Sequence, residues 1–266
     1  MPDFQLGTMF GALAILFNKG VRFGTVIDLG CADGNFFLSC LDNGLLPGAT
    51  CFNVDANAVY EPSLREIQGV VGGHYLIAAV SDSEGELEMH TGSHSYWGSL
   101  LPSDDDYWRN SCNRPNQAVK VPAVTLDGLV QRFALKPPFL LKLDLQGYEL
   151  MALRGGKTML ADTAAVICET SNDGFAPLCE WLTGENFGLF DLTSISRLRD
   201  GTLVELYPVF LNHRLDHIRP TEPWDPSENE TVIARMNQRR QSILEWNAQY
   251  LAKHRSTMSV PTQIRL

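Results

Sequence analysis

Short apolar runs that end on a polar residue recur along most of the chain. Their length and their content of Val, Ile, Leu and Phe are typical of buried strands. We predict strands at 25–29, 51–54, 74–80, 139–144 and 164–169. Segments with helical spacing of apolar residues separate them, at 35–43, 62–68, 126–133, 148–153 and 175–183. This alternation indicates an α/β fold of Rossmann-like type, with a mostly parallel sheet and helices on both faces.

Two further pairs of strand patterns depart from this alternation. Residues 188–192 and 203–211 predict a terminal hairpin that adds one antiparallel strand to the sheet. Residues 86–91 and 119–124 predict a small antiparallel extension. The segment 93–116 between them is rich in Ser, Asp, Asn, Pro and Trp, which is typical of a long, lid-like surface loop.

These patterns divide the chain into three parts. Residues 1–22 form an N-terminal helical cap, and residues 23–219 form the α/β domain. Within that domain, residues 86–124 are an insertion of strands and the lid-like loop. The composition changes after Pro220, so that 220–266 is a linker followed by a C-terminal helix.

The C-terminal helix begins at a capping box, Ser227 to Glu230, and runs to about His254. Apolar residues recur along it at near-heptad spacing: Val232, Ile233, Met236, Ile243, Leu244 and Tyr250. Three roles are open for such an apolar face: packing on its own domain, forming a homodimer or docking a partner, and covering a substrate site.

Composition narrows the possible partners. The net charge is −10 and the pI is about 5.0, so a nucleic-acid backbone is an unsuitable partner and a small or neutral substrate is favoured. The apolar segment 9–17 is too short for a transmembrane segment. The six cysteines include no C-x-x-C pair, which is typical of reduced thiols in a cytoplasmic protein.

The first strand leads into a glycine-containing turn that predicts a ligand site. Gly30 and Gly34 allow the backbone to pass close under a ligand, and Asp28 and Asp55 offer acceptors at the strand ends. The run lacks the G-x-G-x-x-G spacing of dinucleotide sites and places an acid, Asp33, inside the turn. An acid there repels phosphate but suits a sulfonium or amino acid group. S-adenosylmethionine (SAM) therefore fits best, with a dinucleotide or a turn that binds nothing as the alternatives.

Four carboxylates are predicted to meet at one edge of the sheet. Asp28, Asp55, Asp144 and Glu169 all lie at or just after the ends of predicted strands. The carboxyl ends of parallel strands share an edge, and ligands of α/β sheets bind there.

The stretch 140–156, Leu-Leu-Lys-Leu-Asp-Leu-Gln-Gly-Tyr-Glu-Leu-Met-Ala-Leu-Arg-Gly-Gly, resembles the FkbM family of SAM-dependent methyltransferases. The resemblance extends over about residues 20–195 and includes the segments 26–35, 54–57, 78–85, 98–100 and 121–127. It implies a class I methyltransferase fold that transfers the SAM methyl group, usually to a hydroxyl of a sugar, polyketide or other natural product. Two positions depart from the family pattern: Gln146 replaces a frequent Glu, and Ala56 follows Asp55 where a Glu-Pro pair is frequent.

Together, the strand ends and the resemblance predict the SAM-binding residues. Asp55 is expected to accept hydrogen bonds from the ribose hydroxyls, and residues of the glycine turn are expected to surround the methionine part. Ala79, Val80 and Ser81 are expected to lie near the adenine. The expected binding residues are Asp28, Gly30, Cys31, Ala32, Gly34, Asn35, Asp55, Ala56, Asn57, Val80, Ser81, Ser99 and Asp144.

Three residues are candidates for catalysis. Asp144 is the leading candidate for the base that deprotonates a hydroxyl acceptor, although it could instead only orient SAM or cap the next helix. Glu149 could bind the acceptor or, with Asp144, a metal, or could be a first-turn acid favoured by the helix dipole. His94 in the lid-like loop is a second possible base. His213 and His217 have metal-ligand spacing but no further ligand beside them, so no metal is expected.

The sequence thus favours a SAM-dependent O-methyltransferase that acts on a small molecule or a glycan. The alternatives are a SAM-binding protein of the same fold without catalysis and an NAD(P)-dependent oxidoreductase. A missing third glycine in the turn counts against the oxidoreductase.

Overall fold

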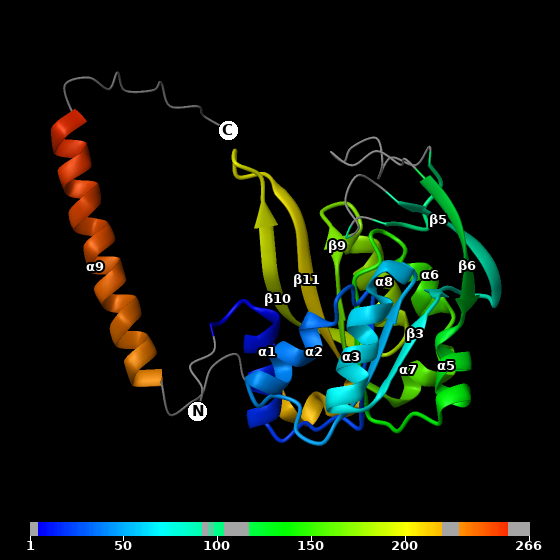
Figure 1. Ribbon diagram of the computed structural model, residues 1–266. Helices are drawn as coiled ribbons and strands as arrows, with labels where there is room; N and C mark the ends of the chain where they lie inside the picture. The colour runs from blue at the N-terminus through cyan, green and yellow to red at the C-terminus, as the bar shows by residue number, and fades with distance from the viewer. Residues whose placement is uncertain (1–4, 92–95, 97, 104–116, 220–228, 255–266) are drawn as a thin grey trace. The chain divides into compact units, whose positions relative to one another are not determined.

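The structure is a computed structural model that describes residues 5–91, 96, 98–103, 117–219 and 229–254 (Figure 1). The chain divides into two compact units, residues 1–216 and residues 217–266. The first unit contains both sheets. The second contains one long helix.

The main sheet has the strand order β10-β11-β8-β7-β1-β2-β3, with β9 paired to β11. All neighbouring strands from β8 to β3 are parallel, whereas β11 is antiparallel to both β8 and β10. The strand bounds are β1 Thr25–Leu29, β2 Thr50–Asp55, β3 His74–Ile77, β7 Phe139–Leu143, β8 Thr163–Cys168, β9 Thr170–Ser171, β10 Phe187–Arg197 and β11 Leu203–Asn212. This topology confirms the predicted α/β fold with its single antiparallel strand.

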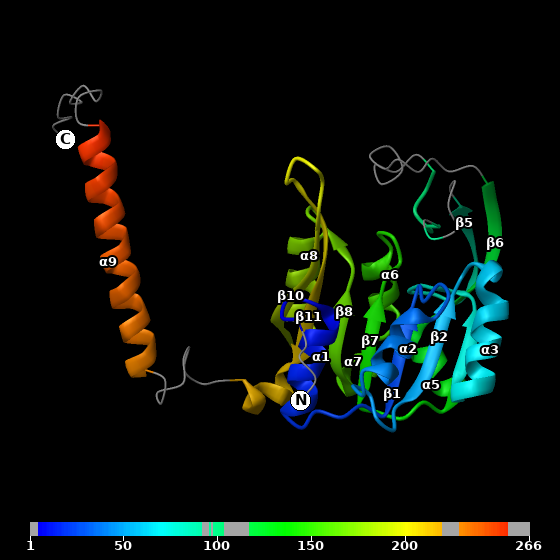
Figure 2. The same cartoon turned by 60° about the vertical axis from the view of Figure 1, so that its left-hand side comes forward.

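Helices cover both faces of the main sheet (Figures 1 and 2). On one face lie α1 (Met9–Asn18), α2 (Asn35–Asp42) and α3 (Glu61–Val71). On the other lie α5 (Leu126–Phe133), α6 (Glu149–Arg154), α7 (Lys157–Asp162) and α8 (Phe175–Gly184). The second group packs its leucines against alternate strand residues, among them Ile27, Leu29, Phe52, Leu141 and Val166, in one continuous apolar core. Short 3-10 helices lie at Ala58–Tyr60 and His213–Ile218.

A second, three-stranded sheet has the order β4-β6-β5. Its strands are β4 (Ala79–Val80), β5 (Gly85–Thr91) and β6 (Gln117–Val124). The predicted antiparallel extension is therefore present. The single strand predicted at 74–80 is wrong, because β3 ends at Ile77 on the main sheet and Ala79–Val80 pairs with β6 instead.

Local sequence signals account for several element ends. The side chain of Thr125 caps α5 by accepting a hydrogen bond from the Gly128 N–H at 3.0 Å. Helix α7 was not predicted, because it is only six residues long and directly follows Gly155 and Gly156. The hairpin strands β10 and β11 are longer than the patterns indicated, and irregular pairing near Asp191 and Ser196 interrupts their alternation.

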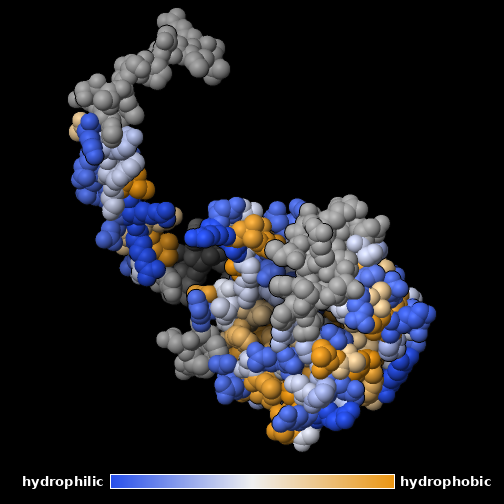
Figure 3. All heavy atoms as spheres, turned by 45° about the horizontal axis from the view of Figure 1, so that its top comes forward, coloured by the Kyte–Doolittle hydropathy of each residue, from blue (hydrophilic) through white to orange (hydrophobic). Residues whose placement is uncertain are grey.

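The second unit consists of α9, Asn229–His254, which confirms the predicted C-terminal helix. Its apolar side chains remain exposed within the unit, interspersed with polar ones along the helix (Figure 3). No helix of the described chain is both long enough and apolar enough to cross a lipid bilayer.

Candidate active site

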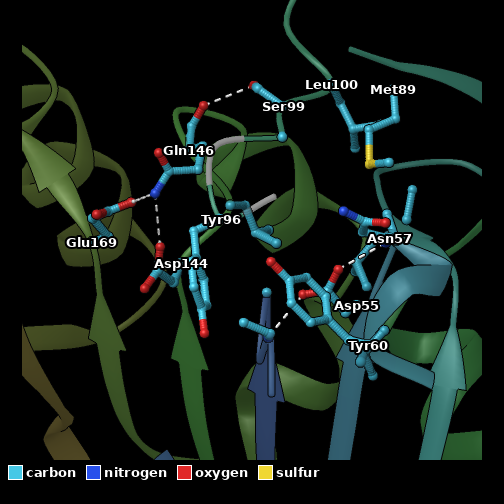
Figure 4. A pocket seen from close by; sticks show the side chains of 18 of the residues that line it. Asp55, Asn57, Tyr60, Met89, Tyr96, Ser99, Leu100, Asp144, Gln146 and Glu169 are labelled. Carbon is cyan, nitrogen blue, oxygen red and sulfur yellow. Dashed lines mark hydrogen bonds between the residues drawn. The ribbon is translucent and has the colours of Figure 1, made fainter. Parts of the chain in front are cut away.

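A cavity of about 290 Å³ opens where the main-sheet strands end, beside the second sheet (Figure 4). Strands β1, β2, β7 and β8 all point their carboxyl ends toward it. The antiparallel strand β11 contributes its amino end to the same edge, since Glu205 and Leu206 pair with β9 just beyond Cys168. The lining residues are Gly30, Ala32, Val54, Asp55, Ala56, Asn57, Tyr60, Ala78, Ala79, Val80, Met89, Tyr96, Gly98, Ser99, Leu100, Asp144, Leu145, Gln146, Glu169, Glu205 and Tyr207.

Gly30 brings the ends of three strands together under the cavity. Its N–H donates to the Val54 carbonyl oxygen at 2.9 Å, and its φ is +67°. A Cβ at this position would collide with the Asp144 carbonyl oxygen. Only glycine therefore allows β1 to pass this close to the chain that follows β7.

Asp55 presents a fixed carboxylate at the end of β2. Its Oδ2 accepts from the Ala32 N–H at 2.9 Å, and its Oδ1 accepts from the Asn57 N–H at 2.8 Å. Burial raises the pKa of Asp55 to about 6, and the two backbone N–H groups act in the opposite direction. Each oxygen retains a lone pair for a ligand hydroxyl.

Apolar and aromatic side chains line the cavity on the side of Asp55, away from Asp144 and Glu169 (Figure 4). Met89 and Leu100 come from the second sheet and the segment after it. Tyr60 lies 5.7 Å from Tyr96 between ring centroids, and the Tyr96 hydroxyl donates to Asp33. This wall suits a flat heterocycle such as adenine.

Two carboxylates share their hydrogen-bond donors at the other end of the cavity. The Gln146 side-chain amide donates to Asp144 Oδ1 at 3.0 Å and to Glu169 Oε2 at 2.9 Å (Figure 4). The Tyr207 hydroxyl oxygen lies 2.9 Å from Asp144 Oδ2 and 3.2 Å from Glu169 Oε1.

A buried lysine sets the charge of this pair. Lys142 Nζ lies 3.3 Å from Asp144 Oδ2 and 3.2 Å from Asp28 Oδ1. Burial alone would raise the pKa of Asp144, but Lys142 and the hydrogen bonds outweigh it and hold that pKa below its usual value. Burial and the Asp144 carboxylate raise the pKa of Glu169 well above its usual range. Asp144 is thus the ionised member of the pair at neutral pH.

The structure brings eight of the residues expected to bind the cofactor to the cavity wall: Gly30, Ala32, Asp55, Ala56, Asn57, Val80, Ser99 and Asp144. Ser99 also anchors the second sheet, because its hydroxyl donates to the Gln146 carbonyl oxygen at 2.8 Å.

The other five expected cofactor residues lie elsewhere. Asp28 is buried beside Lys142, its partner in the β1–β7 register. Its carboxylate does not line the cavity. Cys31 packs into an apolar cluster, Gly34 packs against Ile67, and Asn35 is the exposed first residue of α2. Ser81 is buried, with its hydroxyl 3.3 Å from that of Tyr148.

Of the two expected catalytic residues that the structure describes, Asp144 lines the cavity and Glu149 does not. Glu149 is turned away from it: its Oε1 accepts from the N–H groups of Leu145 and Gly147 at 2.8 and 3.1 Å and closes the loop before α6. This contact supports a structural role for Glu149 and not a catalytic one. His94 lies outside the described residues. Within the described ranges, no group of three or more His, Cys, Asp or Glu side chains is arranged as a metal site.

Tyr207 and Glu205 line the cavity but were not among the residues expected there. They alternate with Leu206 on β11, so that both face the same side. The hairpin pattern predicts this alternation and an antiparallel strand, but not that β11 pairs with β8, which brings Glu205 and Tyr207 beside the ends of the parallel strands.

The chemistry of the lining fits SAM. Four carboxyl groups, those of Asp55, Asp144, Glu169 and Glu205, face the cavity, and the described lining includes no Lys, Arg or His. Such a surface repels the phosphates of a dinucleotide but accommodates a sulfonium cation and hydroxyl groups.

Comparison with solved structures finds remote likenesses. The chain is 8% identical to a precorrin-6y C5,15-methyltransferase from Geobacter metallireducens GS-15 (TM-score 0.41; 79% of this chain and 93% of that chain covered). It is 10% identical to an uncharacterized protein from Listeria monocytogenes serotype 4b (TM-score 0.44; 97% and 90% covered). It is 14% identical to Sp1610 of Streptococcus pneumoniae, a putative tRNA (m1A22) methyltransferase solved in complex with S-adenosyl-L-methionine (TM-score 0.41; 91% and 93% covered). At these scores none of the three supports an inference about substrate or mechanism.

Comparison with curated proteins gave no match. The family model described as the methyltransferase FkbM domain matches residues 49–189, which include β2, the second sheet, the loop after β7 and Glu169. Because this match spans more than half of the 266 residues, the chain belongs to the FkbM family of SAM-dependent methyltransferases.

Proposed function

We propose that the protein methylates a hydroxyl group of a small molecule or a glycan, with Asp144 as the base. The observation that carries this proposal is the environment of the Asp144 carboxylate. It faces the cavity, and Lys142 together with the donors of Gln146 and Tyr207 favours its ionised form. Its Oδ1 accepts one hydrogen bond and has a second lone pair for the proton of an acceptor hydroxyl.

The residues of the cavity have separate tasks in this reaction. The bound cofactor supplies an electrophilic methyl group. Asp55 binds the ribose hydroxyls, and the wall of Met89, Leu100 and Tyr60 holds the adenine and excludes water. Asp144 takes the proton of the acceptor hydroxyl while the oxygen of that hydroxyl bonds to the methyl carbon. The electron pair of the broken carbon–sulfur bond stays on sulfur.

The charge of the chain supports a neutral acceptor. The net charge is −10, and the described cavity lining has carboxyl groups but no cationic side chain. A phosphate-rich acceptor such as RNA, the substrate class named for Sp1610, would be repelled by both. Hydroxyl groups, in contrast, donate readily to carboxylates.

An acceptor screen tests the proposal. The full chain would be incubated with SAM carrying a labelled methyl group and with panels of sugars, polyketides, glycans and RNA. We expect label in a hydroxyl-bearing small molecule or glycan, and a loss of at least about a hundredfold in turnover for Asp144→Asn. Transfer only to RNA, or full activity of Asp144→Asn, would refute the proposal.

A further inference from the structure

The contacts around Asp144 and Glu169 outnumber the protons that their neighbours can donate, which does not suit two ionised carboxylates. Four oxygen contacts join the pair to Gln146 and Tyr207. The two N–H groups of the Gln146 amide satisfy two of these contacts. The Tyr207 hydroxyl makes the other two, at 2.9 and 3.2 Å, but has only one proton to donate.

A proton on one of the carboxyl groups makes both Tyr207 contacts full hydrogen bonds, whereas one hydroxyl proton shared between two carboxylates would leave each contact weaker. If both carboxylates were ionised and the hydroxyl donated to only one of them, lone pairs would face each other across the other distance inside a buried site. A single additional proton removes this conflict. The tyrosine oxygen then accepts from a carboxylic acid on one side and donates to a carboxylate on the other.

The surrounding charges place this proton on Glu169. Lys142 Nζ lies 3.3 Å from Asp144 and stabilises its ionised form. No ion pair joins Glu169 to a cation in the part of the chain that the structure describes, and its exposed fraction is 8%. The charges that act on it, those of Asp144, Glu149 and Glu205, are all acidic. Burial and these acids raise the pKa of Glu169 well above its usual range, in agreement with the hydrogen-bond geometry.

We propose that Glu169 is a positioning residue that works as a carboxylic acid: it donates to Tyr207, which donates to Asp144 and holds that carboxylate toward the acceptor hydroxyl. The role in catalysis rests on the methyl transfer proposed above. The shared proton does not. During transfer the acceptor proton adds to Asp144, so that the pair briefly holds two protons and then releases one to solvent.

Gln146 completes the arrangement. Its φ of +53° is in the left-handed region, which directs the amide between the two carboxyl groups. A glutamate at this position would offer no N–H donor and would add a third acid. The departure from the family pattern at position 146 thus supports a carboxyl pair that is held together by donors.

The protonation state can be measured without an acceptor. Full-length protein with ¹³C-labelled glutamate carboxyl groups would be titrated by NMR, with Glu169→Gln to assign the signal. We expect the Glu169 signal to keep the shift of a carboxylic acid through pH 7. In Asp144→Asn, Glu169 loses its acidic neighbour and gains the influence of Lys142, so its midpoint should fall by about one pH unit or more.

The exposed acid of α2 provides the matched control, since Asp42→Asn should leave the midpoint of Glu169 unchanged. A Glu169 signal that titrates near pH 4.5 in the unmodified protein would overturn the proposal, as would a midpoint that Asp144→Asn does not move. Either result leaves the methyl transfer itself unaffected, so the two hypotheses fail separately.

Kinetics with an accepted substrate test the positioning role. In Glu169→Gln the amide oxygen can accept from Gln146 and the amide N–H can donate to Tyr207, which reproduces the pattern of the acid. We expect Glu169→Ala to lose at least about tenfold in kcat, and Glu169→Gln to regain most of that loss with an unchanged KM for SAM. Any alkaline decline in kcat caused by ionisation of Glu169 should be absent from Glu169→Gln. If Glu169→Gln is as inactive as Asp144→Asn, Glu169 itself takes the proton and the positioning role is refuted.

Discussion

Asp55 combines structural and ligand contacts in one carboxylate. Its two oxygens hold the turn after β1 and the chain after β2, and both face the cavity. We predict that Asp55→Ala weakens binding of S-adenosylhomocysteine by about 10- to 100-fold, because hydrogen bonds to a charged group are lost. Isothermal titration calorimetry measures this, with the exposed Asp42→Asn as the control.

The raised pKa of Asp55 adds a pH signature to the same measurement. Since that pKa is about 6, the carboxylate becomes protonated as the pH falls from 7 to 5 and is then a weaker acceptor. Binding of S-adenosylhomocysteine should weaken over this range in the unmodified protein and much less in Asp55→Ala. Equal pH dependence in both proteins would contradict a ribose contact by Asp55.

Glu149 is predicted to affect stability and not turnover. Burial raises its folded-state pKa from 4.5 to about 7. Between these values the unfolded chain releases a proton that the folded chain retains, so stability falls as the pH rises. Glu149→Gln removes this pH-dependent contribution to stability and retains an oxygen that accepts from the Leu145 and Gly147 N–H groups.

Urea unfolding of both proteins checks this prediction. Between pH 4.5 and pH 7, the unmodified protein should lose about 3 kcal/mol of its free energy of unfolding relative to Glu149→Gln. Above pH 7 the difference between the two proteins should stay constant. A difference that does not change with pH would show that Glu149 titrates normally.

At the scale of elements, the turn from β1 to α2 depends on Gly30. Gly30 and Gly20 both have positive φ values, +67° and +88°, but a Cβ at Gly20 would meet no atom within 4 Å. Gly20→Ala should therefore cost about 1 kcal/mol of backbone strain. Gly30→Ala should cost about 3 kcal/mol or more and abolish cofactor binding, because the Asp144 carbonyl must also move.

The comparison of these two variants by urea unfolding separates strain from collision. Similar losses for both would mean that β1 and the chain after β7 can move apart without cost, which contradicts the close approach on which the cavity depends.

The elements also show what sequence patterns can and cannot predict. Gly30, Asp55 and Asp144 could be placed because each follows a clear parallel strand, and such strands end at one edge. Tyr207 could not, because the hairpin pattern predicts an antiparallel strand but not that β11 lies between β8 and β10, next to the strand that ends at the cavity. The sequence left open whether Glu149 binds the acceptor or only stabilises the start of α6. The positive φ values of Gln146 and Gly147, which turn the loop onto its carboxylate, cannot be predicted from the pattern. The division of 74–80 into β3 and β4 was likewise a tertiary effect, imposed by pairing with β6.

At the scale of the whole molecule, α9 presents apolar residues that its own unit does not bury. Met236, Ile243 and Tyr250 recur every seven residues, and their exposed fractions are 61%, 49% and 41%. We propose that this stripe pairs two copies of the chain as a homodimer. Ile243→Glu should shift the mass toward the monomer in sedimentation equilibrium, whereas Gln238→Glu on the opposite side of the helix should not. Equal masses for both variants would exclude the stripe as the interface.

A crystal structure of the protein with bound S-adenosylhomocysteine tests the assignment of the cofactor site and of Asp144 as the base. We expect the adenine against Met89 and Leu100, the ribose hydroxyls within hydrogen-bond distance of Asp55, and the sulfur atom facing Asp144 and Glu169 across an open space for the acceptor. A ligand bound elsewhere, or one in this cavity with its ribose far from Asp55 and its sulfur turned away from Asp144, would contradict the assignment of both the cofactor site and the base.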